Sequence, residues 1–100
     1  MAKGYWIVRV DVTDPEAYRA YGAANAEAFR KFGARFLVRA GKYETVEGMS
    51  RPRNVVIEFK DYATALACYR SPEYAAAKML RVGAASADII VIEGYDGPQP

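Results

Sequence analysis

Two helix-start signals, set between four apolar segments, constrain the fold of this chain more than any other feature. The signals are Asp-Pro-Glu at 14–16 and Ser-Pro-Glu at 71–73. A side-chain oxygen at the first position can accept hydrogen bonds from the first N–H groups of a helix, and proline is tolerated at the first helical residue. Each signal therefore predicts the start of a helix.

Segments rich in β-branched and aromatic residues predict four strands, at 4–12, 34–40, 54–60 and 88–95. Helices are expected at 15–32, 62–69 and 74–81. Gly41 interrupts an extended pattern that resumes over 42–47, which indicates a β-bulge or bend at that glycine. The order is β-α-β-β-α-β, with the second helix broken at Ser71-Pro72. This order is typical of an α+β, ferredoxin-like βαββαβ plait.

The chain is long enough for one hydrophobic core and too short for two. We expect a single domain over 1–95 and a flexible tail over 96–100. Its 14 basic and 12 acidic residues are interspersed, which gives no electrostatic case for binding nucleic acid or a membrane surface. The longest apolar runs are only strand-sized, so the sequence predicts no membrane segment and a cytoplasmic protein.

The scarcity of histidine and cysteine in the sequence limits the kinds of metal site and enzyme that this chain can form. The chain has no histidine, and its single cysteine is Cys68. A disulfide within the chain, a Cys/His metal site, a histidine-dependent hydrolase and haem held by a histidine are therefore excluded. We expect neither a metal nor a cofactor, and acid–base work would fall to Tyr, Asp, Glu, Lys and Arg.

Alternation with period two assigns the strand residues to two faces of a sheet. One predicted face is wholly apolar and is expected to lie under the helices: Trp6, Val8, Val10, Val12, Phe36, Val38, Val55, Ile57, Phe59, Ile90 and Ile92. The other mixes aliphatic and charged residues: Ile7, Arg9, Asp11, Arg35, Leu37, Arg39, Val56, Glu58, Ile89, Val91 and Glu93. Because an exposed apolar surface of this kind usually binds a partner, we expect a homodimer through the second face.

The charges on that second face have two interpretations. They can form an ion-pair network that only sets the dimer interface, because a lone buried ion is costly. Alternatively they line a ligand pocket, in which Arg39 holds a carboxylate or enolate and Glu58 acts as a base. Tyr69 and Tyr74 flank the helix break, and either pack in the core or line a cleft with Ser71 and Arg81.

Several motifs resemble one bacterial family, the domain of unknown function 1330. They are Gly-Tyr-Trp-Ile at 4–7, the helix start at 14–18, Arg-Phe-Leu-Val-Arg at 35–39, Val-Val-Ile-Glu-Phe at 55–59, Tyr-Arg-Ser-Pro-Glu-Tyr at 69–74, Arg81, Ala-Asp at 87–88 and Glu-Gly at 93–94. The resemblance covers about 4–95. It departs at Ala40-Gly41, where the family usually has two glycines.

The resemblance implies membership of the dimeric α/β-barrel superfamily, in which two plaits join sheet to sheet with their helices outside. Relatives there include cofactor-free monooxygenases, muconolactone isomerases, haem peroxidases and non-catalytic stress or ligand-binding proteins. The haem relatives use a histidine ligand that this chain lacks. The family itself implies a fold and a pocket but no particular reaction.

Two functional hypotheses follow. The first is a homodimer that binds a small anionic or carbonyl-containing organic molecule, with cofactor-independent isomerase or oxygenase-type chemistry. Its candidate catalytic residues are Arg39, which stabilises negative charge, and Glu58, which moves a proton, a task that a tyrosine could also perform. Its candidate ligand-binding residues are Arg9, Tyr69, Ser71, Tyr74, Arg81 and Glu93. The second is a non-catalytic dimer whose charged sheet face only sets the interface.

Overall fold

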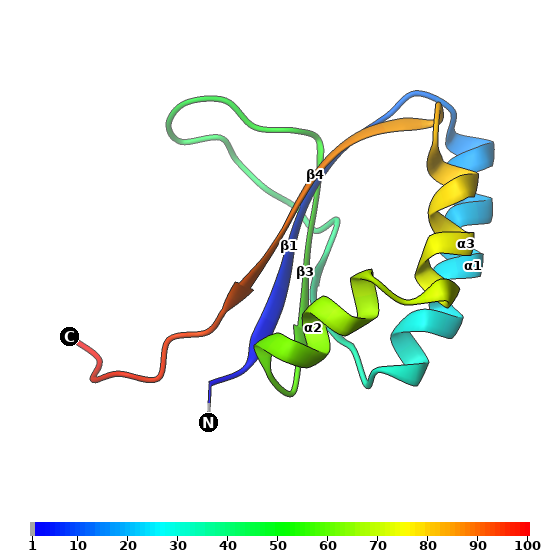
Figure 1. Cartoon of the computed structure of the whole chain (residues 1–100). Helices are drawn as coiled ribbons and strands as arrows, with labels where there is room; N and C mark the ends of the chain where they lie inside the picture. Colours follow the sequence, from blue (N-terminus) through cyan, green and yellow to red (C-terminus); the bar gives the residue numbers. More distant parts are fainter. Residues whose placement is uncertain (1) are drawn as a thin grey trace.

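A four-stranded antiparallel sheet with three helices on one side makes up the computed structural model, which describes residues 2–100 (Figure 1). The elements are β1 (Gly4–Val12), α1 (Pro15–Lys31), β2 (Arg35–Arg39), β3 (Arg53–Phe59), α2 (Tyr62–Tyr69), α3 (Pro72–Arg81) and β4 (Ala85–Glu93). The strand order across the sheet is β2-β3-β1-β4. The predicted α+β, ferredoxin-like fold is confirmed, including the helix break between α2 and α3. No described helix is long and apolar enough to cross a membrane.

The helices begin where the sequence predicts. The side chains of Asp14, Asp61 and Ser71 each accept a hydrogen bond from the backbone N–H three residues further on, at 3.2, 2.8 and 3.1 Å. The hydrogen bond from Thr64 holds the pKa of Asp61 below its usual value. These contacts satisfy N–H groups that a helix cannot pair internally, and fix the residues at which α1, α2 and α3 begin.

Trp6 lies at the centre of the core, between the sheet and the helices. It is 1% exposed, and its indole N–H donates to the Ala65 carbonyl at 2.9 Å. Edge-to-face contacts join its ring to Phe29, Tyr69 and Tyr74, with centroids 5.0–5.5 Å apart. This aromatic cluster connects β1 to all three helices.

The prediction for the faces of β4 was wrong. Trp6 lies opposite Val91 and Val8 lies opposite Ile89, so Ile89 and Val91 face the helices. Ile90 and Ile92 instead lie on the uncovered face, where they are 54% and 46% exposed. Glu93 follows Val91 in phase and is also on the helix side. Four consecutive apolar residues do not define which face is buried, so only the register with β1 decides it.

The bulge in the second strand also lies elsewhere than predicted. Pairing shifts between Phe36 and Val38, not at Gly41, so that Val38 lies opposite Val56 and Arg39 opposite Val55. One extra residue inverts the alternation that follows it. Val38 therefore moves to the uncovered face and Arg39 moves to the helix side, the reverse of the predicted placement.

Residues 40–52, here called the arm, leave the sheet on the side away from the helices (Figure 1). The extended strand predicted at 42–47 is absent from it. Three large apolar side chains of the arm are exposed: Tyr43, Val46 and Met49. The arm therefore stands beside the uncovered face of the sheet, here called the open face.

The open face mixes apolar side chains with charges of both signs. Its central apolar residues are Ile7, Val38, Val56, Ile90 and Ile92. Its charged residues are Arg9, Asp11, Arg35, Glu58 and Asp88. No helix of the described chain covers this surface.

Candidate ligand site between helix α1 and the sheet

A cavity of about 40 Å³ lies between α1 and the sheet, against the Trp6 ring. Its wall is mostly aromatic and aliphatic, with two arginines and one amide: Trp6, Val8, Tyr18, Tyr21, Gly22, Asn25, Phe29, Phe36, Arg39, Arg53, Val55 and Ile57. Asn25 is a buried polar residue of α1. A concave, largely apolar space with a few polar groups is the usual form of a small-molecule site.

The two arginines reach this cavity because of the strand register. The bulge in β2 places Arg39 opposite Val55, and Arg53 precedes Val55 by two residues on the same face of β3. The Arg39 guanidinium lies 4.3 Å from the centroid of the Phe36 ring, and that of Arg53 lies 5.3 Å from the centroid of Tyr18. Both cations therefore rest on aromatic faces that line the cavity.

Neither Arg39 nor Arg53 forms an ion pair with any residue from 2 to 100. The Nε atom of Arg53 is buried and has no hydrogen-bond partner. A buried donor without a partner is destabilising, and guanidinium groups bind carboxylates and similar planar anions strongly. The cavity mouth is therefore chemically suited to an anion.

A buried polar chain adjoins the same cavity. The hydroxyl groups of Tyr21 and Tyr74 are 2.7 Å apart, and the Arg81 guanidinium lies 5.3 Å from the centroid of the Tyr21 ring. Burial, followed by the neighbouring Tyr21, raises the pKa of Tyr74 well above its usual value. Tyr74 therefore stays protonated and acts as a hydrogen-bonding group rather than a base.

The residues predicted around the helix break have separate roles. Ser71 caps α3 and donates to the Cys68 carbonyl at 2.7 Å. Tyr69 packs on Trp6 and accepts a hydrogen bond from Lys78 at 3.0 Å. None of the predicted group lines the cavity itself: Tyr69 contacts its wall at Trp6, and Tyr74 and Arg81 contact it at Tyr21. The lone thiol, Cys68, is fully buried, and burial raises its pKa to about 12.

The remaining candidates lie outside the cavity. Glu58 is on the open face and accepts a hydrogen bond from the Tyr5 hydroxyl at 3.4 Å. Glu93 lies at the end of β4, in a shallow groove with Asp61. Since Arg39 is on the helix side, the bulge separates it from Glu58, and the two do not form one catalytic pair.

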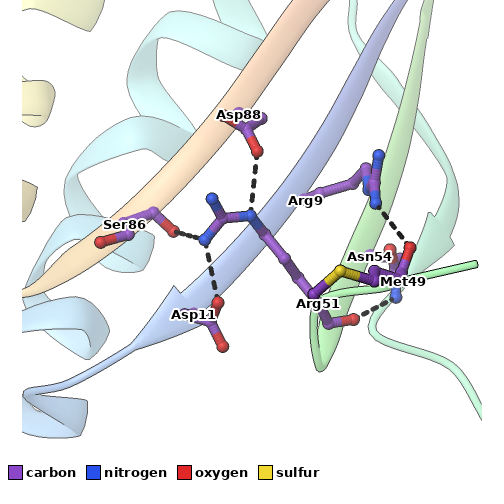
Figure 2. Close-up of polar contacts among 7 residues, drawn as sticks. All are labelled: Arg9, Asp11, Met49, Arg51, Asn54, Ser86 and Asp88. Atoms are coloured by element: carbon purple, nitrogen blue, oxygen red, sulfur yellow. Dashed lines mark hydrogen bonds and ion pairs between the residues drawn. The ribbon is translucent and has the colours of Figure 1, made fainter.

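Arg51 anchors the end of the arm to the open face (Figure 2). Its guanidinium donates to Asp11 and Asp88, each at 2.9 Å, and so joins β1 to β4. Arg9 donates to the Met49 carbonyl at 3.3 Å, which fixes a second point of the arm (Figure 2). The open-face arginines Arg9 and Arg51 therefore have partners within the chain.

Sequence reasoning missed Arg53, Tyr18, Gly22 and Asn25 as cavity residues. Arg53 was detectable, because it alternates in phase with Val55 and Ile57 and so falls on the apolar face. An arginine on a face that is otherwise apolar is unusual, and it indicates either a partner or a ligand. The α1 residues carried no comparable signal.

The sheet order and the one-sided helices define a ferredoxin-like protein, and solved structures share this fold. A protein of unknown function from Rhodopseudomonas palustris has a TM-score of 0.72 at 19% identity, covering 96% of this chain and 85% of its own. SnoaB from Streptomyces nogalater, described as a cofactor-independent oxygenase, has a TM-score of 0.63 at 12% identity, covering 100% and 97%. A dimeric ferredoxin-like protein of unknown function from Thermobifida fusca has a TM-score of 0.59 at 13% identity, covering 92% and 89%.

At these identities the likeness to solved structures shows the fold alone. A search of curated proteins gives no significant match. Residues 3–95 match the family model described as Domain of unknown function (DUF1330), and the chain belongs to this family.

Proposed function

We propose that this protein is a homodimer that binds a small organic anion, or a carbonyl compound that forms an enolate, at the mouth of the cavity between α1 and the sheet. The observation that carries the proposal is the pair of arginines, Arg39 and Arg53, at an aromatic cavity with no acidic partner from the described chain. The buried, unpartnered Nε of Arg53 adds to it. A bound carboxylate or enolate would satisfy these donors.

Ligand binding is better supported than proton abstraction. The described residues lining the cavity include no Asp or Glu, and Tyr74, behind the Tyr21 hydroxyl, has a raised pKa. A general base needs a pKa near the working pH, and the raised pKa of Tyr74 lies further from that range than that of an ordinary tyrosine. If the protein is a catalyst, its arginines would stabilise an enolate, as cofactor-independent isomerase or oxygenase chemistry requires. The oxygenase described among the structural neighbours supports that version.

The open face supports the homodimer. Val38, Ile90 and Ile92 are 42%, 54% and 46% exposed there, and charges of both signs surround them. A face with both apolar and complementary charged groups can pair with a second copy of itself about a two-fold axis. The arm, which carries exposed Val46 and Met49, stands beside that face and can reach a second copy. The dimeric neighbour from Thermobifida fusca agrees with this assembly.

A thermal-shift titration tests ligand binding, with benzoate as the carboxylate probe and acetylacetone as the enolate probe. We expect one of them, at about 100 times its dissociation constant, to stabilise the fold by roughly 2.7 kcal/mol, a rise of several degrees in Tm. Arg39→Gln and Arg53→Gln should abolish the rise. Arg30→Gln, on the exposed end of α1, should keep it.

A rise that persists in both Arg39→Gln and Arg53→Gln contradicts the proposed site. The absence of any rise with either probe in the wild-type protein contradicts ligand binding. In that case the non-catalytic dimer, with an interface set by the open face, is the better description.

A further inference from the structure

The cavity between α1 and the sheet adjoins a larger surface groove, and Arg39 and Arg53 line both. Outside the inner cavity lies a groove of about 570 Å³, and the two spaces have Tyr18, Gly22, Arg39 and Arg53 in common. Arg19 adds a third cation to the groove, and no Asp or Glu lines it in the described chain. The groove has the volume of an ordinary small-molecule site, of roughly 300 to 1,000 Å³, whereas the inner cavity is too small to enclose a whole ligand. A ligand held by the arginines therefore lies mainly in the groove, with one end facing the cavity.

Gly22 lies at the boundary between these two spaces, in the middle of α1. Glycine in a helix interior is less favourable than alanine, so its presence needs a reason. Packing does not supply one, since a Cβ added to Gly22 would meet nothing within 4 Å. Its backbone is helical and does not have the positive φ that favours glycine. The remaining feature of Gly22 is the open space that its missing side chain leaves between the groove and the cavity.

We infer that Gly22 keeps open a passage through which one narrow end of the ligand reaches the Trp6 ring, and so selects the ligand by shape. This inference rests on the proposed function, because Arg39 and Arg53 hold the anionic group at the entrance of the passage. The ligand class is then an amphiphilic anion, with one carboxylate or enolate, a body in the groove and a slim end in the aromatic cavity. A compact polyanion such as citrate fits the cations but not the apolar cavity behind them.

Trp6 reports on this passage directly. It is the only tryptophan of the chain, and its ring lines the inner cavity. A nitroaryl group quenches indole fluorescence at short range, so 4-nitrobenzoate is a suitable probe. With its carboxylate on the arginines, its nitro end would point towards Trp6. We expect saturable quenching by 4-nitrobenzoate, competition by benzoate without quenching, and no competition by citrate at equal concentration.

Substitutions at Gly22 test whether a side chain at this position blocks the passage without unfolding the protein. Gly22→Leu should weaken 4-nitrobenzoate binding by about tenfold or more and remove most of the quenching, because the leucine fills the passage. Its Tm should equal or exceed that of the wild-type protein, since leucine is the better helix former. Ala20→Leu, on an exposed part of the same helix that lines neither space, should change the affinity by about twofold at most.

The outcomes distinguish this inference from the proposed function. If 4-nitrobenzoate binds and Arg53→Gln removes binding, but Gly22→Leu leaves affinity and quenching unchanged, the passage is contradicted and the anion site stands. If citrate competes as well as benzoate, the ligand class is overturned. If the wild-type protein binds neither aryl carboxylate, the proposed function fails and the inference fails with it.

Discussion

The two faces of the sheet both carry arginines, and they use them differently. On the open face, Arg51 pairs with two carboxylates and Arg9 donates to a backbone carbonyl (Figure 2). On the helix side, Arg39 and Arg53 rest on aromatic rings and have no ion-pair partner in the described chain. The first pattern stabilises the fold, because the charges are satisfied internally. The second leaves charge for something outside the chain. Arg35 on the open face also has no ion-pair partner in the described chain, but it is exposed and does not line the cavity. The candidate site is therefore located by unpaired arginines that meet at a cavity.

The largest expected effect is on assembly, at the open face. Val56 lies in the middle of β3, and its half-buried side chain is on that face. Val56→Asp would place an unpaired carboxylate in the centre of the proposed dimer interface, which is strongly unfavourable. We expect sedimentation velocity to show a dimer for the wild-type protein and a folded monomer for the variant.

The matched control for that experiment is Ala63→Asp, on the exposed surface of α2. It adds the same charge on the helix layer and should remain a dimer. A Val56→Asp protein with the mass of a dimer would show that the open face is not the interface. The arm and Arg51, which anchors it to the open face, would then have no role in the dimer interface.

The next prediction compares a paired arginine with an unpaired one. Arg51→Gln removes two ion pairs of partly exposed groups, so it should lower the free energy of unfolding by about 1 kcal/mol. Arg53→Gln should change it by less than about 0.5 kcal/mol, because the lost cation–π contact is offset by removing a buried donor without a partner. Urea unfolding at one fixed protein concentration measures both. If both variants lost the same free energy of unfolding, Arg53 would stabilise the fold as much as Arg51 does. The distinction between paired arginines that stabilise the fold and unpaired arginines that can bind a ligand would then fail.

The fold was predictable from local signals that agree with one another. The Asp14 and Ser71 caps, each followed by proline, gave the helix starts, and the β-branched segments gave the strands. The face of each strand was harder to predict. It was correct for β1 and for Val55, Ile57 and Phe59 of β3. It was wrong for β4, where Ile90 and Ile92 are as apolar as the partly buried Ile89 and Val91. There the pairing register, a long-range property, decides.

The candidate site was less predictable, for a related reason. Arg39 was predicted on the open face but lies on the helix side, because a bulge among aliphatic residues leaves no mark in the sequence. The predicted pairing of Arg39 with Glu58 assumed that both side chains share a face, whereas Glu58 lies on the open face. The contribution of α1, through Tyr18, Gly22 and Asn25, depends on how that helix packs over β3. Packing of this kind is not encoded in local periodicity.

The smallest expected effect concerns a paired charge on the helix layer. Lys31 of α1 donates to Glu73 of α3 at 2.8 Å, and this hydrogen bond, with the backbone N–H of Glu73, lowers the pKa of Glu73. Because the pKa is lower in the folded than in the unfolded state, the contact stabilises the fold above the unfolded pKa and is lost as the pH falls through the folded one. Glu73→Gln should therefore lower Tm slightly at about pH 7 and leave it equal to the wild-type value near about pH 3. A Tm difference of the same size at both pH values would mean that Glu73 stabilises the fold through its shape and not through its charge.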